Sequence, residues 1–143
     1  MTEVAHAPGF GEPLTAPPAY AEAVPFDLDL SPLRRLVKAR ARALGLAPAR
    51  VVDLVLAVGE ATANTVRHAG GRGTLRIWQD DVEIVCEVSD GGHMKNTRAG
   101  EVRPKAGTRG GQGLWIIHQA CDRVEVSSDD AGTVVRMHMR RAG

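Results

Sequence analysis

Residues 51–70, VVDLVLAVGEATANTVRHAG, constrain the fold more than any other part of this 143-residue chain. Apolar residues recur there with the period of an amphipathic helix, so much of this helix must be buried. Two polar residues, Glu60 and Asn64, stand four apart and therefore share one face. A carboxylate and an amide at the edge of an apolar helix predict the floor of a site, and a surface hydrogen bond is the alternative. The residues expected on the buried faces are Val51, Val52, Leu54, Val55, Val58, Ala61 and Val66.

Length and charge limit the classes of protein that fit. A chain of 143 residues is long enough for one domain with a substantial core. Eighteen basic residues stand against seventeen acidic ones, so no overall field indicates direct binding to nucleic acid or to a membrane. The apolar segments are shorter than the roughly 18 residues of a spanning helix, and we expect a cytoplasmic protein. Cys86 and Cys121 lack CxxC spacing and are expected to be small buried residues.

Hydrophobic patterns and turn residues divide the chain into elements. Residues 1–20 are rich in Pro, Gly and Ala, which predicts a flexible N-terminal tail before a domain over residues 21–143. Ser31 is expected to cap the first helix, which ends at Gly45. The order of elements predicts an α/β two-layer sandwich, with a mixed, mostly antiparallel sheet and the helices on one face. The expected strands are residues 23–30, 74–79, 82–89, 123–127 and 133–139, and the later helices are residues 51–70 and 114–120.

The first expected helix carries a run of basic side chains. One interpretation is a docking surface for an acidic partner, and the other is a solvated face opposite the apolar stripe. The pattern alone favours the solvated face. The residues are Arg34, Arg35, Lys38, Arg40 and Arg42.

Residues 90–112 lack a hydrophobic period for more than twenty positions and are rich in Gly and basic residues. A loop of this length in a compact domain is usually functional or disordered. Gly111 and Gly113 stand directly at the start of the next expected helix, where main-chain N–H groups can approach an anion such as phosphate. A flexible surface loop is the alternative interpretation.

Asp90 follows an expected buried strand and precedes Gly91 and Gly92. A carboxylate at this position can accept a hydrogen bond from an exocyclic amine such as that of adenine, while the glycines leave room for a flat ligand. Considered singly, an Asp-Gly-Gly sequence also fits a simple turn. The motif therefore gains meaning only in combination with the others.

The combination of motifs resembles the Bergerat-fold ATPases, the superfamily of gyrase, histidine kinases and MutL. Glu60-xxx-Asn64, Asp90-x-Gly92, Gly111-x-Gly113-Leu114 and a later Thr133 occur in the order typical of that superfamily. Within it, residues 23–139 are most similar to the bacterial anti-sigma factor serine/threonine kinases of the SpoIIAB and RsbW type. Histidine kinases generally have Asn where Glu60 stands, so Glu60 indicates a domain that can activate a hydroxyl group.

The resemblance implies ATP and Mg²⁺ as cofactors and a role for each matching residue. Glu60 would be the general base and Arg109 a lid arginine that reaches the γ-phosphate, and both would be catalytic. Asn64 would bind the Mg²⁺. The remaining implied contacts are Arg67 with phosphate, Asp90 with the adenine amine, Gly92 as space for the base, the main chain of Gly111, Gly113 and Leu114 over the phosphates, and Thr133 in support of Asp90 or its bridging water. Met94 stands where the family's pattern has a second glycine, which predicts a looser wall or weaker nucleotide binding.

The resemblance also implies a function. The expected protein binds ATP, phosphorylates a serine or threonine of a STAS-type anti-anti-sigma protein and sequesters a sigma factor. Two alternatives are a non-catalytic, nucleotide-gated binding module and a detached ATPase domain of a larger sensor protein, with residues 1–20 as its former linker. Whether two copies form a homodimer stays open.

Overall fold

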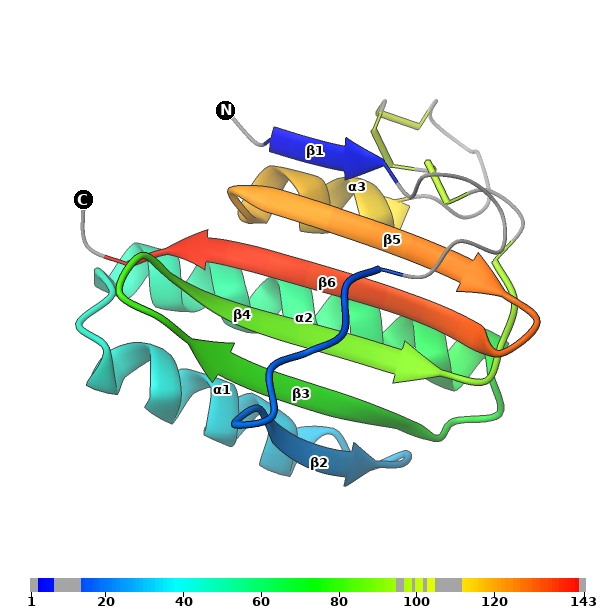
Figure 1. Cartoon of the computed structure of the whole chain (residues 1–143), viewed down its shortest axis with the longest axis horizontal. Coiled ribbons are helices and arrows are strands. Elements are labelled where there is room, and N and C mark those ends of the chain that lie inside the picture. The colour runs from blue at the N-terminus through cyan, green and yellow to red at the C-terminus, as the bar shows by residue number, and fades with distance from the viewer. Residues whose placement is uncertain are drawn as a thin grey trace.

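The computed structural model describes residues 3–6 by their main chain, and residues 14–94, 97–98, 100–101, 103–104 and 112–141. In this part of the chain, three helices lie on one face of a sheet (Figure 1). The strands are β1 (Glu3–His6), β2 (Glu22–Phe26), β3 (Gly73–Gln79), β4 (Glu83–Asp90), β5 (Arg123–Asp129) and β6 (Gly132–Arg140), and the helices are α1 (Ser31–Ala43), α2 (Pro48–His68) and α3 (Gln112–Ala120).

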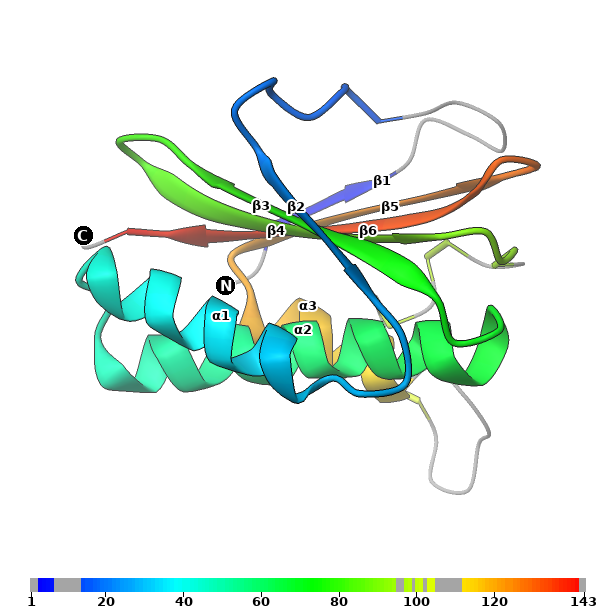
Figure 2. The same ribbon diagram turned by 90° about the horizontal axis from the view of Figure 1, so that it is seen from below.

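The strands follow one another across the sheet in the order β1-β5-β6-β4-β3-β2. All neighbours are antiparallel except β1 and β5, which are parallel. Figure 2 shows the helical layer on one side of the sheet. The predicted α/β two-layer sandwich with a mixed, mostly antiparallel sheet and helices on one face is therefore confirmed.

The core lies between the helices and the sheet. α1 buries Leu33, Val37 and Ala41, which recur every four residues on one face. The inward face of α2 meets residues of β3, β4, β5 and β6 in one continuous hydrophobic cluster. The prediction for Val52 is wrong, since 65% of its surface is exposed. A helix that packs on a sheet presents only one of its faces to that sheet, and Val52 lies on the opposite face of α2.

The start of α1 differs from the prediction that Ser31 is its cap. Ser31 is the first helical residue, and Leu30 occupies the cap position without a side-chain hydrogen bond. Asp29 accepts a hydrogen bond from the Ser31 N–H at 3.2 Å instead. The acceptor for this end of α1 therefore comes from the preceding turn. The expected strand over residues 23–30 is also shorter, because β2 ends at Phe26.

Part of the expected N-terminal tail joins the sheet. β1 pairs with β5 from Glu3 to His6 and forms one edge. Residues 14–21 then cross the face of the sheet opposite the helices and lead into β2 at the other edge (Figure 2). In this crossing segment, the carbonyl oxygen of Thr15 accepts a hydrogen bond from Arg136 on β6. The segment thereby covers part of the sheet face on which none of the described helices lies.

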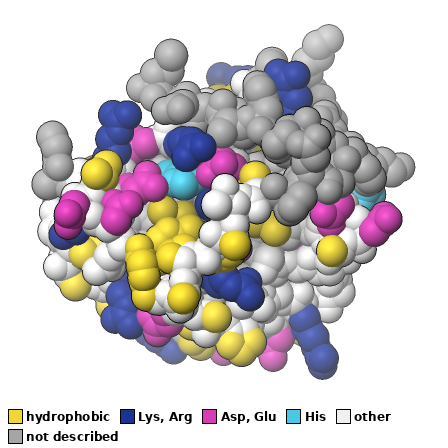
Figure 3. Space-filling model, viewed as in Figure 1, with side chains coloured by type: hydrophobic (Ala, Val, Ile, Leu, Met, Phe, Trp, Pro, Cys, Tyr) yellow, Lys and Arg dark blue, Asp and Glu magenta, His cyan; other side chains and the backbone are white. Residues whose placement is uncertain are grey.

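The helix-free face of the sheet carries charged residues that are largely buried. Glu87 on β4 pairs with Arg136 on β6, with Nη2 and Oε2 2.6 Å apart and both side chains at most 7% exposed. The Arg136 guanidinium also lies over the Trp78 ring, 5.3 Å from its centroid. Figure 3 shows this face, with acidic and basic side chains around a group of hydrophobic ones. Ion pairing compensates for the removal of these charges from water.

His138 on β6 lies between two carboxylates on this face. Its Nδ1 is 2.8 Å from Glu83 Oε2, and its Nε2 is 2.7 Å from Glu125 Oε1. Burial by itself would lower the pKa of His138, but the hydrogen bonds with Glu125 and Glu83 outweigh it and raise that pKa above its usual value. The pKa of Glu125 is lowered, chiefly by its hydrogen bond with His138 and also by the charge of Arg123. The three side chains therefore form a cluster that favours the charged imidazolium.

The two cysteines are buried, as predicted, and neither forms a disulfide. Burial raises the pKa of the Cys121 thiol to about 12 and that of Cys86 well above its usual range. Within the described part of the chain, none of the helices has the length and apolar character that crossing a bilayer requires.

We predict that His138→Gln lowers the free energy of unfolding by about 2 kcal/mol near pH 6, because hydrogen bonds to charged groups contribute roughly 1.5–3 kcal/mol. The raised pKa means that the charged imidazole stabilises the fold fully below its unfolded pKa of about 6.5. This contribution is lost as the pH rises through the folded pKa, so the difference between variant and wild type shrinks toward about pH 9. Urea unfolding of both proteins at pH 6 and at about pH 9 measures this difference in the free energy of unfolding. A difference that does not depend on pH would contradict the charged cluster.

Candidate functional site

A cavity of about 750 Å³ opens between α2, the end of β4, the start of α3 and β6. Its walls contain every predicted site residue that the structure describes. Arg109 and Gly111, the other two predicted residues, lie outside the described residues. The residues brought together are Glu60, Asn64, Arg67, Asp90, Gly92, Gly113, Leu114 and Thr133.

Asp90 is the last residue of β4 and is held by two hydrogen bonds. Its Oδ2 accepts one from the Thr65 hydroxyl at 2.8 Å, and its Oδ1 accepts one from the Gly92 N–H, also at 2.8 Å. Thr65 belongs to α2 and is completely buried. Each carboxylate oxygen has a second lone pair, so both can still accept a hydrogen bond from a ligand. The two bonds fix the direction in which Asp90 faces the cavity.

Thr133 is bonded to the turn that follows Asp90, and its predicted support of a water bridging to Asp90 stays a prediction. Its hydroxyl donates to the Gly92 carbonyl oxygen at 2.9 Å and shares a hydrogen bond of 2.8 Å with Ser128. Thr133 is paired with Asp90 in the register of β4 and β6, but only through the strand ladder. The direct support of the Asp90 side chain therefore comes from Thr65. Thr133 holds the main chain that follows Asp90.

Two glycines permit close packing around Asp90. A Cβ on Gly92 would lie 2.7 Å from the Cβ of Ala69 and 3.2 Å from Asp90 Oδ1. Gly132 has a φ of +136°, and a Cβ there would overlap the carbonyl oxygen of Asp90. A side chain at either position would push the β4 end away from α2 or from β6.

Met94 occupies the position at which the family's pattern has another glycine. Its N–H donates to the buried Ser128 hydroxyl at 2.8 Å, and its partly buried side chain packs against the core and lines the cavity. The main chain at residue 94 is thus attached to β5 through Ser128. Whether this wall weakens nucleotide binding stays a prediction.

Glu60 and Asn64 lie one turn apart on α2 and face the start of α3. A Cβ on Gly113 would be 3.2 Å from Glu60 Oε2 and 3.6 Å from Asn64 Oδ1. The first turn of α3 therefore lies directly against the two polar side chains. N–H groups in the first turn of a helix have no partner within the helix and carry its partial positive charge. This end of the cavity suits an anion.

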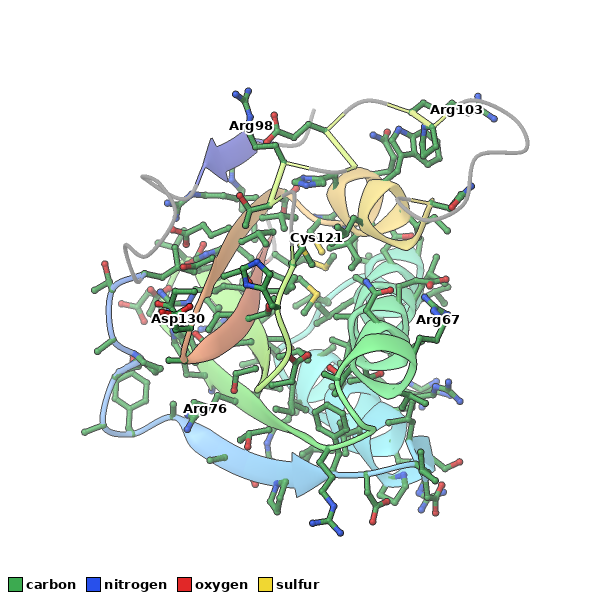
Figure 4. All side chains as sticks on the ribbon, turned by 90° about the vertical axis from the view of Figure 1, so that its right-hand side faces the viewer. Arg67, Arg76, Arg98, Arg103, Cys121 and Asp130 are labelled. Carbon is green, nitrogen blue, oxygen red and sulfur yellow. The ribbon has the colours of Figure 1, made fainter. Side chains whose placement is uncertain are left out.

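Arg67 lies one turn beyond Asn64 and contacts it. Its Nη2 donates to Asn64 Oδ1 at 2.7 Å. Figure 4 shows Arg67 on the side of α2 that is turned away from the sheet. Arg67 is exposed and lies at the mouth of the cavity, so its charge is available to a ligand there.

Two residues that support the cavity walls, Thr65 and Ser128, were not predicted from the sequence. Thr65 follows Ala57 and Ala61 at spacings of four, so it continues the buried stripe of α2. A buried hydroxyl in such a stripe requires a hydrogen-bond partner. The sequence therefore indicated that Thr65 contacts another polar group, although it did not identify that group. Ser128 gave no comparable signal, because its partners at Met94 and Thr133 depend on the register of β5 and β6.

A comparison with protein-family models matches residues 26–139 to the histidine kinase-like ATPase domain. This match covers more than three quarters of the chain. A search of curated proteins found none that matches. The matched range begins in β2 and ends in β6, and it contains α2, the end of β4 and α3, which form the cavity. The chain therefore belongs to the family of histidine kinase-like ATPase domains.

Proposed function

We propose that this chain binds ATP·Mg²⁺ in the cavity described above and transfers the γ-phosphoryl group to a serine or threonine of a regulatory protein. The observation that carries this proposal is the convergence of Glu60, Asn64 and Asp90 on one cavity. These residues come from two elements that are far apart in the sequence. Their convergence supports a shared ligand rather than three separate surface features.

Asp90 suits the adenine end of the nucleotide. The hydrogen bonds from Thr65 and from the Gly92 N–H orient its carboxylate, and each oxygen retains the capacity to accept one more. An adenine 6-amino group is a donor of this kind. Gly92 lines the cavity beside Asp90, and a side chain there would crowd both Ala69 and the Asp90 carboxylate.

The opposite end of the cavity suits the phosphates and their cation. Gly113 and Leu114 lie in the first turn of α3, where main-chain N–H groups provide donors for phosphate oxygens. Asn64 offers one amide oxygen as a ligand, and phosphates and water supply most of the oxygens that Mg²⁺ requires. When bound, the cation neutralises charge on the phosphates. Arg67 is placed to bind a phosphate oxygen, and Arg109 and Gly111 keep the roles that the resemblance implies.

Glu60 takes the proton of the attacking hydroxyl in this proposal. The hydroxyl oxygen forms a bond to the γ-phosphorus while the bond from that phosphorus to the bridging oxygen breaks, and ADP leaves with the electron pair. A carboxylate within reach of the attacking hydroxyl can act as a general base in this way. Positioning and charge stabilisation supply most of the catalysis in phosphoryl transfer.

The partners in this proposal come from the resemblance to anti-sigma factor kinases. The phosphoacceptor is a STAS-type anti-anti-sigma protein, and the chain sequesters a sigma factor when that protein is phosphorylated. Such a regulator acts in the cytoplasm and needs no direct contact with nucleic acid. A homodimer is compatible with it.

A nucleotide-binding module without transfer is the second candidate function. The observation that favours it is the hydrogen bond from Arg67 to Asn64 Oδ1, which occupies the oxygen that the cation requires. If this bond persisted in the complex, nucleotide would bind without a correctly placed Mg²⁺. The retained carboxylate of Glu60 favours the kinase.

We predict that Glu60→Ala reduces the transfer of label from ATP to a STAS-type protein by about 10²–10⁴-fold, because it removes the general base. Affinity for ATP should change little, since Glu60 is not needed to hold the base or the phosphates. Label transfer and calorimetry measure the two effects. Asp53→Ala, on the same helix outside the cavity, is the matched control and should retain transfer. Tight ATP binding without transfer by the wild type would favour the binding module.

We predict that Thr65→Val weakens binding of ADP by about tenfold, because loss of one hydrogen bond to a carboxylate costs roughly 1.5 kcal/mol. Valine keeps the shape of threonine and removes only the donor to Asp90. Thr62→Val is the control, since the Thr62 hydroxyl is buried on the same helix but bonds only to Val58 and Gly59 carbonyls. Thr65→Ser should restore affinity. Equal losses in the Thr62 and Thr65 variants would show a general effect on α2 instead.

A further inference from the structure

Helix α2 has a second apolar stripe that the sheet does not cover. Val51, Leu54 and Val58 face the core and are at most 5% exposed. On the outward side, Val52 is 65% and Leu56 is 47% exposed, although both are large hydrophobic residues. A helix of a globular domain needs one apolar stripe to pack against its core. The outward stripe indicates contact with something outside this domain.

The outward stripe forms one wall of a groove between α1 and α2. The groove encloses about 580 Å³, and Val52, Val55 and Leu56 provide its apolar lining. Arg34 and Lys38 of α1 form the other wall. Along α2 the lining extends from Val51 to Arg67, which corresponds to about 24 Å at 1.5 Å per residue. A helix of about sixteen residues has this length.

One end of the groove reaches the candidate site. Glu60 and Arg67 line both this groove and the cavity proposed to bind ATP. Each of these two residues is therefore part of the lining of both hollows. A molecule seated in the groove would therefore lie beside the proposed general base.

The lining of the groove has more basic than acidic residues, since Arg34, Lys38 and Arg67 stand against Glu60. α1 contains five basic residues and no acidic residue, whereas the rest of the chain has thirteen basic against seventeen acidic residues. Arg34 and Lys38 lie at the groove, and Arg67 adds a third positive charge at its end. An apolar floor with a basic wall is complementary to an acidic segment that carries apolar side chains.

We propose that this groove binds an acidic amphipathic helix of the protein that receives the phosphoryl group. The proposal rests on the kinase function for the identity of the partner, and on the groove alone for the chemistry of the docked helix. A second copy of this chain does not offer such a helix among the described elements. α1 and α3 have no acidic residue, and α2 has only Asp53 and Glu60.

The test uses the full chain with ADP and Mg²⁺ and three labelled synthetic peptides of about eighteen residues. The first has Leu at positions i, i+3, i+4 and i+7 with Glu elsewhere, the second has the same composition in scrambled order, and the third has Lys in place of Glu. Fluorescence anisotropy measures their affinities. We expect the acidic amphipathic peptide to bind at least about tenfold more tightly than the other two.

Matched charge reversals locate the binding. Arg34→Glu with Lys38→Glu should weaken binding of the acidic peptide by about tenfold, since two favourable charge pairs become repulsive. Arg35→Glu with Arg42→Glu changes the charge of the same helix equally, but neither residue lines the groove, and the effect should stay within about twofold. Leu56→Asp should abolish binding, and calorimetry should show unchanged ADP affinity in every variant.

Several results would overturn the proposal. In the peptide assay, these results are equal binding of the three peptides, or no binding of the acidic peptide at millimolar concentration. Among the variants, the contradicting result is an equal loss of affinity in the two charge-reversed proteins. Self-association or binding to anionic vesicles that Leu56→Asp removes would show that the groove has a different occupant. Failure of the proposed kinase function gives a different result. The wild-type protein would then bind no ADP or transfer no label, while the peptide would still bind at the groove.

Discussion

The hydrogen bond between Thr65 and Asp90 joins the helical layer to the sheet at the cavity. Asp90 ends β4, and its other oxygen bonds the Gly92 N–H, so one carboxylate fixes α2, the strand end and the following turn together. Gly92 and Gly132 allow this approach, because a side chain at either position would meet Ala69 or the Asp90 main chain. The position of Asp90 in the cavity wall depends on this contact.

On the face of the sheet opposite the helices, buried charged residues are stabilised by pairing with one another. β4 and β6 place Glu87, Arg136 and His138 on the face without helices, where the segment over residues 14–21 covers part of them. Charges in such a position destabilise a fold unless they are paired, and the Glu87–Arg136 pair and the two carboxylates around His138 provide the pairing. The strands β4 and β6, which carry Asp90 and Thr133, are thus stabilised by α2 on one face and by ion pairs on the other.

The sequence predicted those parts of the fold in which local pattern decides the structure. The periodicity of α2, the alternation in β3 to β6 and the glycines at helix ends located the elements, with boundaries that differ by a few residues. β1 was not predicted, because a four-residue strand is defined by its pairing with Arg123–Val126 and not by its own pattern. The exposure of Val52 depends on which faces of α2 the sheet and α1 cover, and the sequence does not specify this.

The same distinction applies to the candidate site. Glu60, Asn64 and Asp90 could be grouped from their motifs, and the structure places them around one cavity. The partner of Thr133 could not be predicted, because it depends on how the turn after β4 folds back onto β6. The support of Asp90 by Thr65 joins residues 25 positions apart on two different layers. Patterns along one element cannot report such a contact, although the buried hydroxyl of Thr65 indicated that some partner exists.

The geometry of α2 explains how one helix can serve both hollows. Each residue advances by about 100° around a helix, so residues four apart differ by only about 40°. Leu56, Glu60 and Asn64 therefore succeed one another around α2, from the groove to the cavity, in two steps of about 40°. Glu60 lies between the groove and the cavity and lines both of them, so α2 connects the two hollows. A partner bound between α1 and α2 would thus lie at a fixed distance from the cavity, because α2 lines both hollows.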